Sequence, residues 1–155
     1  PFTSEACFVS IETSVPVGDS SMGKGPICRV GDRITIFDND ATESILTAGK
    51  IHKIPVQRAL LDRGACEASA LSAFGIKVAG ISVPLGNYHN CTEEGKIDLE
   101  YVKLKDVEKL VDLMIALIKE FPNGPPSHSV SKRHKCRSRV EKMVPFIENS
   151  KGDFS

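Results

Sequence analysis

The sequence has 155 residues, of which 41% are hydrophobic and 26% are charged, and its 20 basic residues balance its 20 acidic residues. This composition is typical of an ordinary globular domain and excludes a disordered or fibrous chain. The zero net charge gives no overall attraction to nucleic acid or to an anionic membrane, and no apolar run approaches the roughly 18 residues that a membrane span requires.

The first half of the chain is expected to contain two strands and a helix. Residues 6–13 (ACFVSIET) and 33–37 (RITIF) are rich in apolar and β-branched residues, which favours strands. The stretch between them is rich in Gly, Pro and Ser and predicts a long loop. A short helix is expected over 40–50, because Asp40 precedes Glu43 by three residues, the spacing of a capping box.

The second half continues the alternation of strand and helix. Residues 54–61 and 76–85 predict strands, the second with few polar side chains, and the Ala-rich segment between Gly64 and Gly75 suits one or two helical turns. A longer helix is expected over 102–121, where apolar residues recur at helical spacing. This stripe consists of Leu104, Val107, Val111, Met114 and Ile118, and it is widened by Leu110 and Leu117.

Alternating β and α segments with nearly continuous apolar strands predict an α/β fold, a mostly parallel sheet with helices on both faces. In such sheets ligands bind beyond the carboxyl ends of the strands. Three features fall at strand ends here, namely Glu12, the turn GACEAS (64–69) and His89. If these strands are parallel, all three features lie on one rim of the sheet.

The character of the chain changes after Phe121, so we expect an α/β portion over 1–121 and a basic, Pro- and Ser-containing tail over 122–155. The tail is interpreted as a solvated extension, with a nucleic-acid contact through phosphate neutralisation as the alternative. The chain has five widely spaced cysteines and no Cys-x-x-Cys pair, which indicates reduced thiols and a cytoplasmic location.

A carboxylate and an imidazole at neighbouring strand ends are suitable ligands for zinc, whose catalytic sites keep one position open for water. Glu12 and His89 form such a pair of candidates, although two ligands are too few for a metal centre. A capped strand end or a hydrogen-bonded histidine is the alternative interpretation of His89.

The stretch GACEASALSAFGIKVAGISVPLGNYHNC (64–91), followed by VKLKDVEKLVDLMIALI (102–118), resembles the C-terminal half of the catalytic domain in the co-catalytic zinc aminopeptidases of the tetrahedral and glutamyl type. In that family a Gly-rich turn G-G-T-D-A precedes a V-I-S-V-P strand, a metal-binding His and a final helix opened by D-L-x-D-V-E. The run 8–32 is similar to the family's strand that ends in a metal-binding acid and to the loop after it. The resemblance covers 6–121 and implies part of a zinc-exopeptidase-like catalytic domain.

By this resemblance, Glu12 matches the acid that binds one metal and His89 matches the histidine that binds the other. The implied cofactors are two divalent metals, zinc or cobalt, and the implied substrate is a peptide. Gly64, Cys66 and Glu67 match the substrate side of the Gly-rich turn, although Glu67 also suits a helix-start carboxylate. Glu12 and Glu67 replace the Asp that is usual in the family, and the tyrosine before His89 is shifted, so the substrate preference is not carried over.

Several residues that the family's site requires do not occur in this sequence. There is no His-x-Asp, and the Glu93–Glu94 pair follows His89, the wrong order for the general base. The resemblance therefore implies part of a metal-dependent aminopeptidase that is inactive alone and is completed by a homo-oligomer or by a companion chain carrying the missing half. The alternative is a non-catalytic binding or assembly module derived from the same fold.

Overall fold

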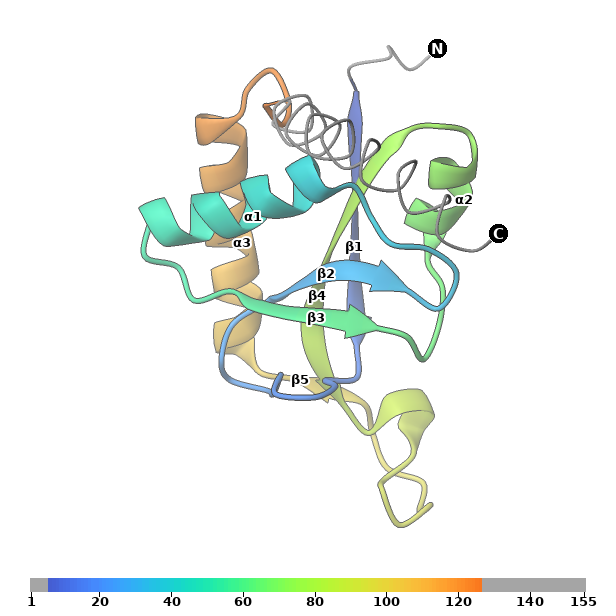
Figure 1. Ribbon diagram of the computed structural model, residues 1–155. Helices are drawn as coiled ribbons and strands as arrows, with labels where there is room; N and C mark the ends of the chain where they lie inside the picture. Colours follow the sequence, from blue (N-terminus) through green and yellow to red (C-terminus); the bar gives the residue numbers. More distant parts are fainter. Residues whose placement is uncertain (1–5, 127–155) are drawn as a thin grey trace, which may run out of the picture.

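The computed structural model describes residues 6–126. None of the helices in this part of the chain is both long enough and apolar enough to cross a membrane. The elements, in chain order, are β1 (Cys7–Ser14), β2 (Ile27–Asp32), α1 (Asn39–Ile51), β3 (Gln57–Leu61), α2 (Glu67–Ala73), β4 (Lys77–Gly86), a short 3-10 turn (Tyr88–Asn90), β5 (Tyr101–Val102) and α3 (Leu104–Glu120) (Figure 1).

The sheet is mixed, and β4 is its central strand. Its strand order is β1-β4-β2-β3, and β5 pairs with the end of β4. The pairs β1–β4 and β2–β3 are parallel, whereas β2 and β4 are antiparallel. Figure 1 shows β2 and β3 running across the direction of β1 and β4, as expected from the twist of a sheet.

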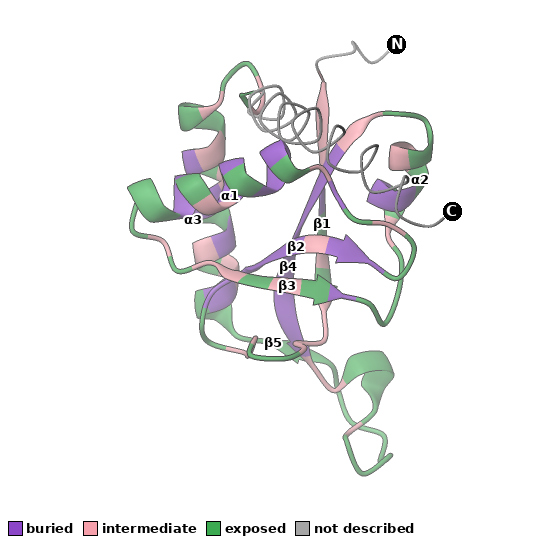
Figure 2. Cartoon of the chain, in the orientation of Figure 1, coloured by how far each residue is buried: buried purple, intermediate pink, exposed green. Residues whose placement is uncertain are grey.

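Helices cover both faces of the sheet, so the predicted α/β architecture is confirmed. Alternate residues of β4 point to opposite faces, as the two-residue period of a strand requires. Ala79 and Ile81 belong to the larger core, in which α1 and α3 contribute Ile45 and Leu113. On the other face Val78 packs with Phe37 and with Ala68 of α2. Burial is continuous along β4 from residue 78 to residue 85, which Figure 2 shows as the purple centre of the molecule.

The loop before β2 is fastened to the start of α3. The carboxylate of Asp106, which is 1% exposed, accepts hydrogen bonds from the backbone N–H groups of Gly23 (2.7 Å) and Gly25 (2.8 Å). Gly25 has a φ of +89°, and an added Cβ would lie 2.2 Å from the carbonyl oxygen of Pro55, so no other residue fits at this position. The connection joins positions more than 80 residues apart in the sequence.

The strand expected at 33–37 is wrong, because the strand in this region is β2, which begins directly after Pro26 and ends at Asp32. The Asp32 carboxylate accepts hydrogen bonds from the backbone N–H groups of Ile34 (2.8 Å) and Thr35 (3.1 Å), and so closes a turn. Ile36 forms only an isolated bridge to Gly31. The strand expected at 54–61 is shortened to β3, and the strand expected at 76–85 corresponds to β4.

The two longer helices were located correctly, but details of each differ from the expectation. Asp38, not Asp40, is the N-cap of α1, and its carboxylate accepts a hydrogen bond of 2.9 Å from the backbone N–H of Ala41. The buried face of α3 differs from the apolar stripe that was expected from the sequence. Leu113 and Ala116 are buried, whereas Leu104 and Ile118 are 71% and 68% exposed.

Candidate functional site

The ends of three strands meet around a small pocket of about 80 Å³. β1 and β4 are parallel, so their carboxyl ends share a rim, and the crossing direction of β3 brings its end to the same place. The pocket is lined by Glu12, Thr13, Ser14, Val15, Val17, Arg29, Leu61, Arg63, Gly64, Ala65 and Tyr88. Of the candidate site residues, Glu12 and Gly64 line this pocket, whereas Cys66, Glu67 and His89 do not.

Glu12 is held by two neighbours on the same face of the sheet. Its Oε2 accepts a hydrogen bond from Nη1 of Arg29 at 2.6 Å in an ion pair, and its Oε1 accepts one from the Ser10 hydroxyl at 3.1 Å. The Glu12 side chain is 26% exposed, whereas that of Arg29 is only 3% exposed. Both oxygens of this carboxylate are therefore engaged by protein donors.

The turn 64–67 is positioned by the buried Asp32 at the end of β2. Oδ2 of Asp32 accepts hydrogen bonds from the backbone N–H of Cys66 (3.0 Å) and from the Ser69 hydroxyl. Burial alone would raise the pKa of Asp32, but the hydrogen bonds from Ser69 and from three backbone N–H groups lower it below the ordinary value. Asp32 therefore fixes the end of β2 to the start of α2 as an ionised carboxylate.

Cys66 and Glu67 begin the helix that follows this turn. Cys66 is the N-cap residue of α2 but makes no side-chain capping bond, and Glu67 lies exposed in the first helical turn, where a carboxylate interacts favourably with the helix dipole. Burial raises the pKa of the Cys66 thiol, and the neighbouring Arg29 offsets this only in part. A protonated thiol is a poor nucleophile.

His89 lies beyond the end of β4 on the surface of the molecule. Its backbone is left-handed, with a φ of 58°, and its ring stacks on that of Tyr88 with a centroid separation of 3.8 Å. The backbone N–H of His89 donates a 2.6 Å hydrogen bond to Oε1 of Glu100. Within residues 6–126 no hydrogen bond holds the His89 imidazole, so the stacking contact with Tyr88 is what orients it.

The described residues do not by themselves fit a metal centre. Residues 6–126 contain no group of three or more His, Cys, Asp or Glu side chains that could hold an ion. Glu12 is committed to Arg29 and Ser10, and the guanidinium of Arg29 puts a fixed positive charge at the position that a metal would have to share. Glu12 and His89 would therefore need further ligands, and Glu12 would also need to leave Arg29.

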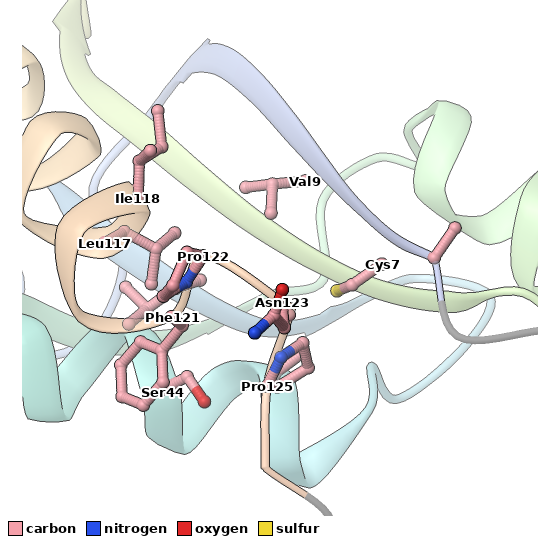
Figure 3. Close-up of a pocket in the computed structure, with 13 residues that line it drawn as sticks. Cys7, Val9, Ser44, Leu117, Ile118, Phe121, Pro122, Asn123 and Pro125 are labelled. Atoms are coloured by element: carbon pink, nitrogen blue, oxygen red, sulfur yellow. The ribbon is translucent and has the colours of Figure 1, made fainter.

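A larger cavity of about 500 Å³ lies on the opposite face of the sheet, between β1, α1 and the end of α3 (Figure 3). Its walls are mostly aliphatic and aromatic, with Val9, Leu117 and Phe121 among them. The titratable side chain in its lining is Cys7, and burial raises the pKa of that thiol to about 11. The cavity has the room for a ligand, but the residues within 6–126 that line it include no carboxylate and no imidazole.

Sequence reasoning missed Arg29 and Asp32, the two buried charged residues of this site. Asp32 could have been found, because an aspartate side chain often accepts a hydrogen bond from the backbone N–H two residues later and so forms a turn. Arg29 gave no local signal, since its partner Glu12 lies on another strand 17 positions earlier.

The model of the M42 glutamyl aminopeptidase family matches residues 5–113. The chain therefore belongs to this family, which confirms the resemblance seen in the sequence.

TET peptidases are among the solved structures that match. Pyrococcus horikoshii TET1 peptidase, which can assemble into a tetrahedron or a large octahedral shell, is 28% identical with a TM-score of 0.59, over 71% of this chain and 32% of that chain. The dodecamer PhTET1-12s is 28% identical with a TM-score of 0.61, over 72% of this chain and 33% of that chain.

A TET aminopeptidase from a marine-sediment Thaumarchaeota archaeon is 26% identical with a TM-score of 0.60, over 72% of this chain and 32% of that chain. The chain thus spans about a third of the length of these structures. A comparison with curated proteins found no match.

Proposed function

We propose that this chain is a portion of the catalytic domain of a metal-dependent aminopeptidase, corresponding to the C-terminal third of such an enzyme. The observation that carries the proposal is the family match over residues 5–113. The pocket at the carboxyl end of β1 supports it, because this is where α/β sheets bind ligands.

Within that enzyme, we assign the turn that contains Gly64, Cys66 and Glu67 to the substrate side of the site, facing a peptide. His89 is proposed as a metal ligand, since it is exposed and its imidazole is free of hydrogen bonds within residues 6–126. Two divalent metals, zinc or cobalt, are the proposed cofactors. Their other ligands and the general base would come from residues outside this sequence, so the chain alone is expected to be inactive.

Homo-oligomerisation and a cytoplasmic location are further parts of the proposal. The first is supported by the dodecamer and the larger shells that the similar TET1 structures form. The second is supported by four cysteines that are all free thiols in the described part of the chain. The basic stretch that raised the nucleic-acid alternative lies outside the described residues.

Fragment complementation tests the proposed function. The chain would be mixed with Pyrococcus horikoshii TET1 truncated to remove its matching third, and release of p-nitroaniline from Glu- and Leu-p-nitroanilide would be measured with added Zn²⁺ or Co²⁺. We expect no turnover by either part alone and metal-dependent turnover by the mixture. The same mixture with His89→Ala is expected to lose that turnover.

A binding or assembly module is the second candidate, favoured by the commitment of Glu12 to Arg29. A folded chain that associates with the truncated enzyme but produces no turnover would support this module and contradict the aminopeptidase. Light scattering after size-exclusion chromatography measures the association independently of activity.

A further inference from the structure

We infer that Glu12 serves in this chain as the counter-ion of the buried Arg29 and not as a metal ligand. The inference stands on contacts within the chain and does not require the proposed function to hold. It changes what that function needs, because any metal of the complete enzyme would then be held without Glu12.

The ion pair reaches across the central strand of the sheet. Glu12 belongs to β1 and Arg29 to β2, and β4 lies between them. The register places Gly80 of β4 beside both Ser10 of β1 and Arg29. Neighbouring strands lie about 4.8 Å apart, so the Arg29 side chain crosses roughly 10 Å to reach Glu12.

Gly80 leaves the space that this crossing needs. A Cβ added at Gly80 would lie 3.1 Å from Cδ of Arg29 and 3.0 Å from the ring of Phe37. Any larger residue at position 80 would push against the Arg29 side chain. The strand thus lacks a side chain at the position over which Arg29 passes.

The charge of Arg29 requires an anion. A guanidinium remains protonated in proteins, and a buried charge without a partner is strongly destabilising. Within residues 6–126 Glu12 is the carboxylate that pairs with Arg29, and Nε of Arg29 has no hydrogen-bond partner there. The pair is therefore Arg29's principal compensation for burial, and withdrawing Glu12 to bind a metal would leave the guanidinium uncompensated.

The residue type at position 12 agrees with this role. The resemblance places an Asp at this position in the family, and Glu is longer by one methylene. That extra length carries the carboxylate toward Arg29, to an Nη1–Oε2 distance of 2.6 Å. The shorter side chain of Glu12→Asp would move the carboxylate away from the Arg29 guanidinium.

A double-mutant cycle tests the pairing. Urea unfolding would be measured for Glu12→Gln, Arg29→Met and the double variant, with the exposed Glu43→Gln as control. We expect each single change to raise the unfolding equilibrium constant. The factor by which the double change raises this constant should be smaller, on the order of tenfold, than the product of the two single-variant factors. A factor for the double variant that agrees within about twofold with the product of the two single-variant factors would overturn the inference. Glu12→Asp gives a milder comparison if Arg29→Met does not fold, and an unfolding constant unchanged by Glu12→Asp would also overturn it.

Titration with Co²⁺ alone tests the second half of the inference. The affinity for Co²⁺, followed by calorimetry and visible absorption, is expected to agree within about twofold between the unmodified chain and Glu12→Gln, or to be undetectable in both. A tenfold loss in Glu12→Gln with unchanged circular dichroism would show that Glu12 is a ligand. In the complemented enzyme, turnover that survives Glu12→Gln supports the inference, whereas absence of turnover in every mixture concerns only the proposed function.

Discussion

The two faces of the sheet differ in the chemical character of their side chains. The face covered by α1 and α3 is filled with aliphatic side chains such as Ile45, Ile81 and Leu113. The face toward α2 carries polar and charged groups near the rim, namely Ser10, Glu12, Arg29, Asp32 and Ser69, joined by hydrogen bonds or an ion pair. Because β4 alternates between the faces residue by residue, the larger aliphatic core and the polar groups of the candidate site lie on opposite sides of one strand.

The largest effect is expected on the aliphatic face. Leu113→Ala removes a fully buried side chain from the core, and the cavity left behind should lower the free energy of unfolding by about 2–5 kcal/mol. Urea unfolding followed by circular dichroism measures the change. Ile115→Ala on the same helix is the control, since Ile115 is 49% exposed and should cost clearly less. Equal losses for the two variants would contradict the burial of Leu113 and the exposure of Ile115.

Gly80→Ala tests the crowding on the polar face. The added methyl group would meet Arg29 and Phe37 at close to 3 Å, so we expect a loss of about 1–3 kcal/mol in the free energy of unfolding. Gly64→Ala is the matched control, because a Cβ there meets nothing within 4 Å. A Gly80→Ala variant as stable as Gly64→Ala would argue against the path of Arg29 over β4.

Ser69→Ala removes one hydrogen bond to Asp32 on the same face. The loss of a bond to a charged group should lower the free energy of unfolding by about 1.5–3 kcal/mol, with part recovered by the better helix propensity of Ala. Ser72→Ala on the same helix, whose hydroxyl has no hydrogen bond within residues 6–126, should be neutral or slightly stabilising. Thermal unfolding of both variants makes the comparison.

The smallest effect concerns pH. The folded-state pKa of Asp32 is lowered from the ordinary value of 3.8, so its contribution to stability is present above that value and is lost as pH falls through the lower folded pKa. Unfolding free energies measured between about pH 5 and pH 3 should therefore fall less steeply for Asp32→Asn than for the unmodified chain. Asp62→Asn, at an exposed position, is the comparison variant.

Local pattern predicted the elements better than it predicted their faces. The positions of α3 and β4 follow from long periodic or continuous apolar runs. Leu104, Val111 and Ile118 recur at helical spacing, and so do the buried residues Leu110, Leu113 and Ala116. Periodicity alone therefore could not show which of the two helix faces is buried. The strand at 33–37 failed because Asp32 satisfies the following N–H groups in a turn before a ladder can form.

The site was only partly accessible to sequence reasoning. Glu12 was reached through resemblance to a family, and its position at the end of β1 follows from the strand pattern. Its pairing with Arg29 depends on strand order, on the β2–β4 register and on the missing side chain at Gly80. These are properties of the assembled sheet, and no local window of the sequence contains them.

The central position of β4 also has a consequence for biosynthesis. β1 and β2 do not pair with each other in the described sheet, since each pairs with β4, which ends only at Gly86. As the chain leaves the ribosome, β2, α1 and β3 can assemble through contacts near in sequence, whereas β1 must wait for β4. The loop that contains Gly23 and Gly25 can be fixed only later, after Asp106 of α3 has been synthesised. β1 is thus placed only after β4, although it is synthesised before β2, and its apolar residues need protection during that interval.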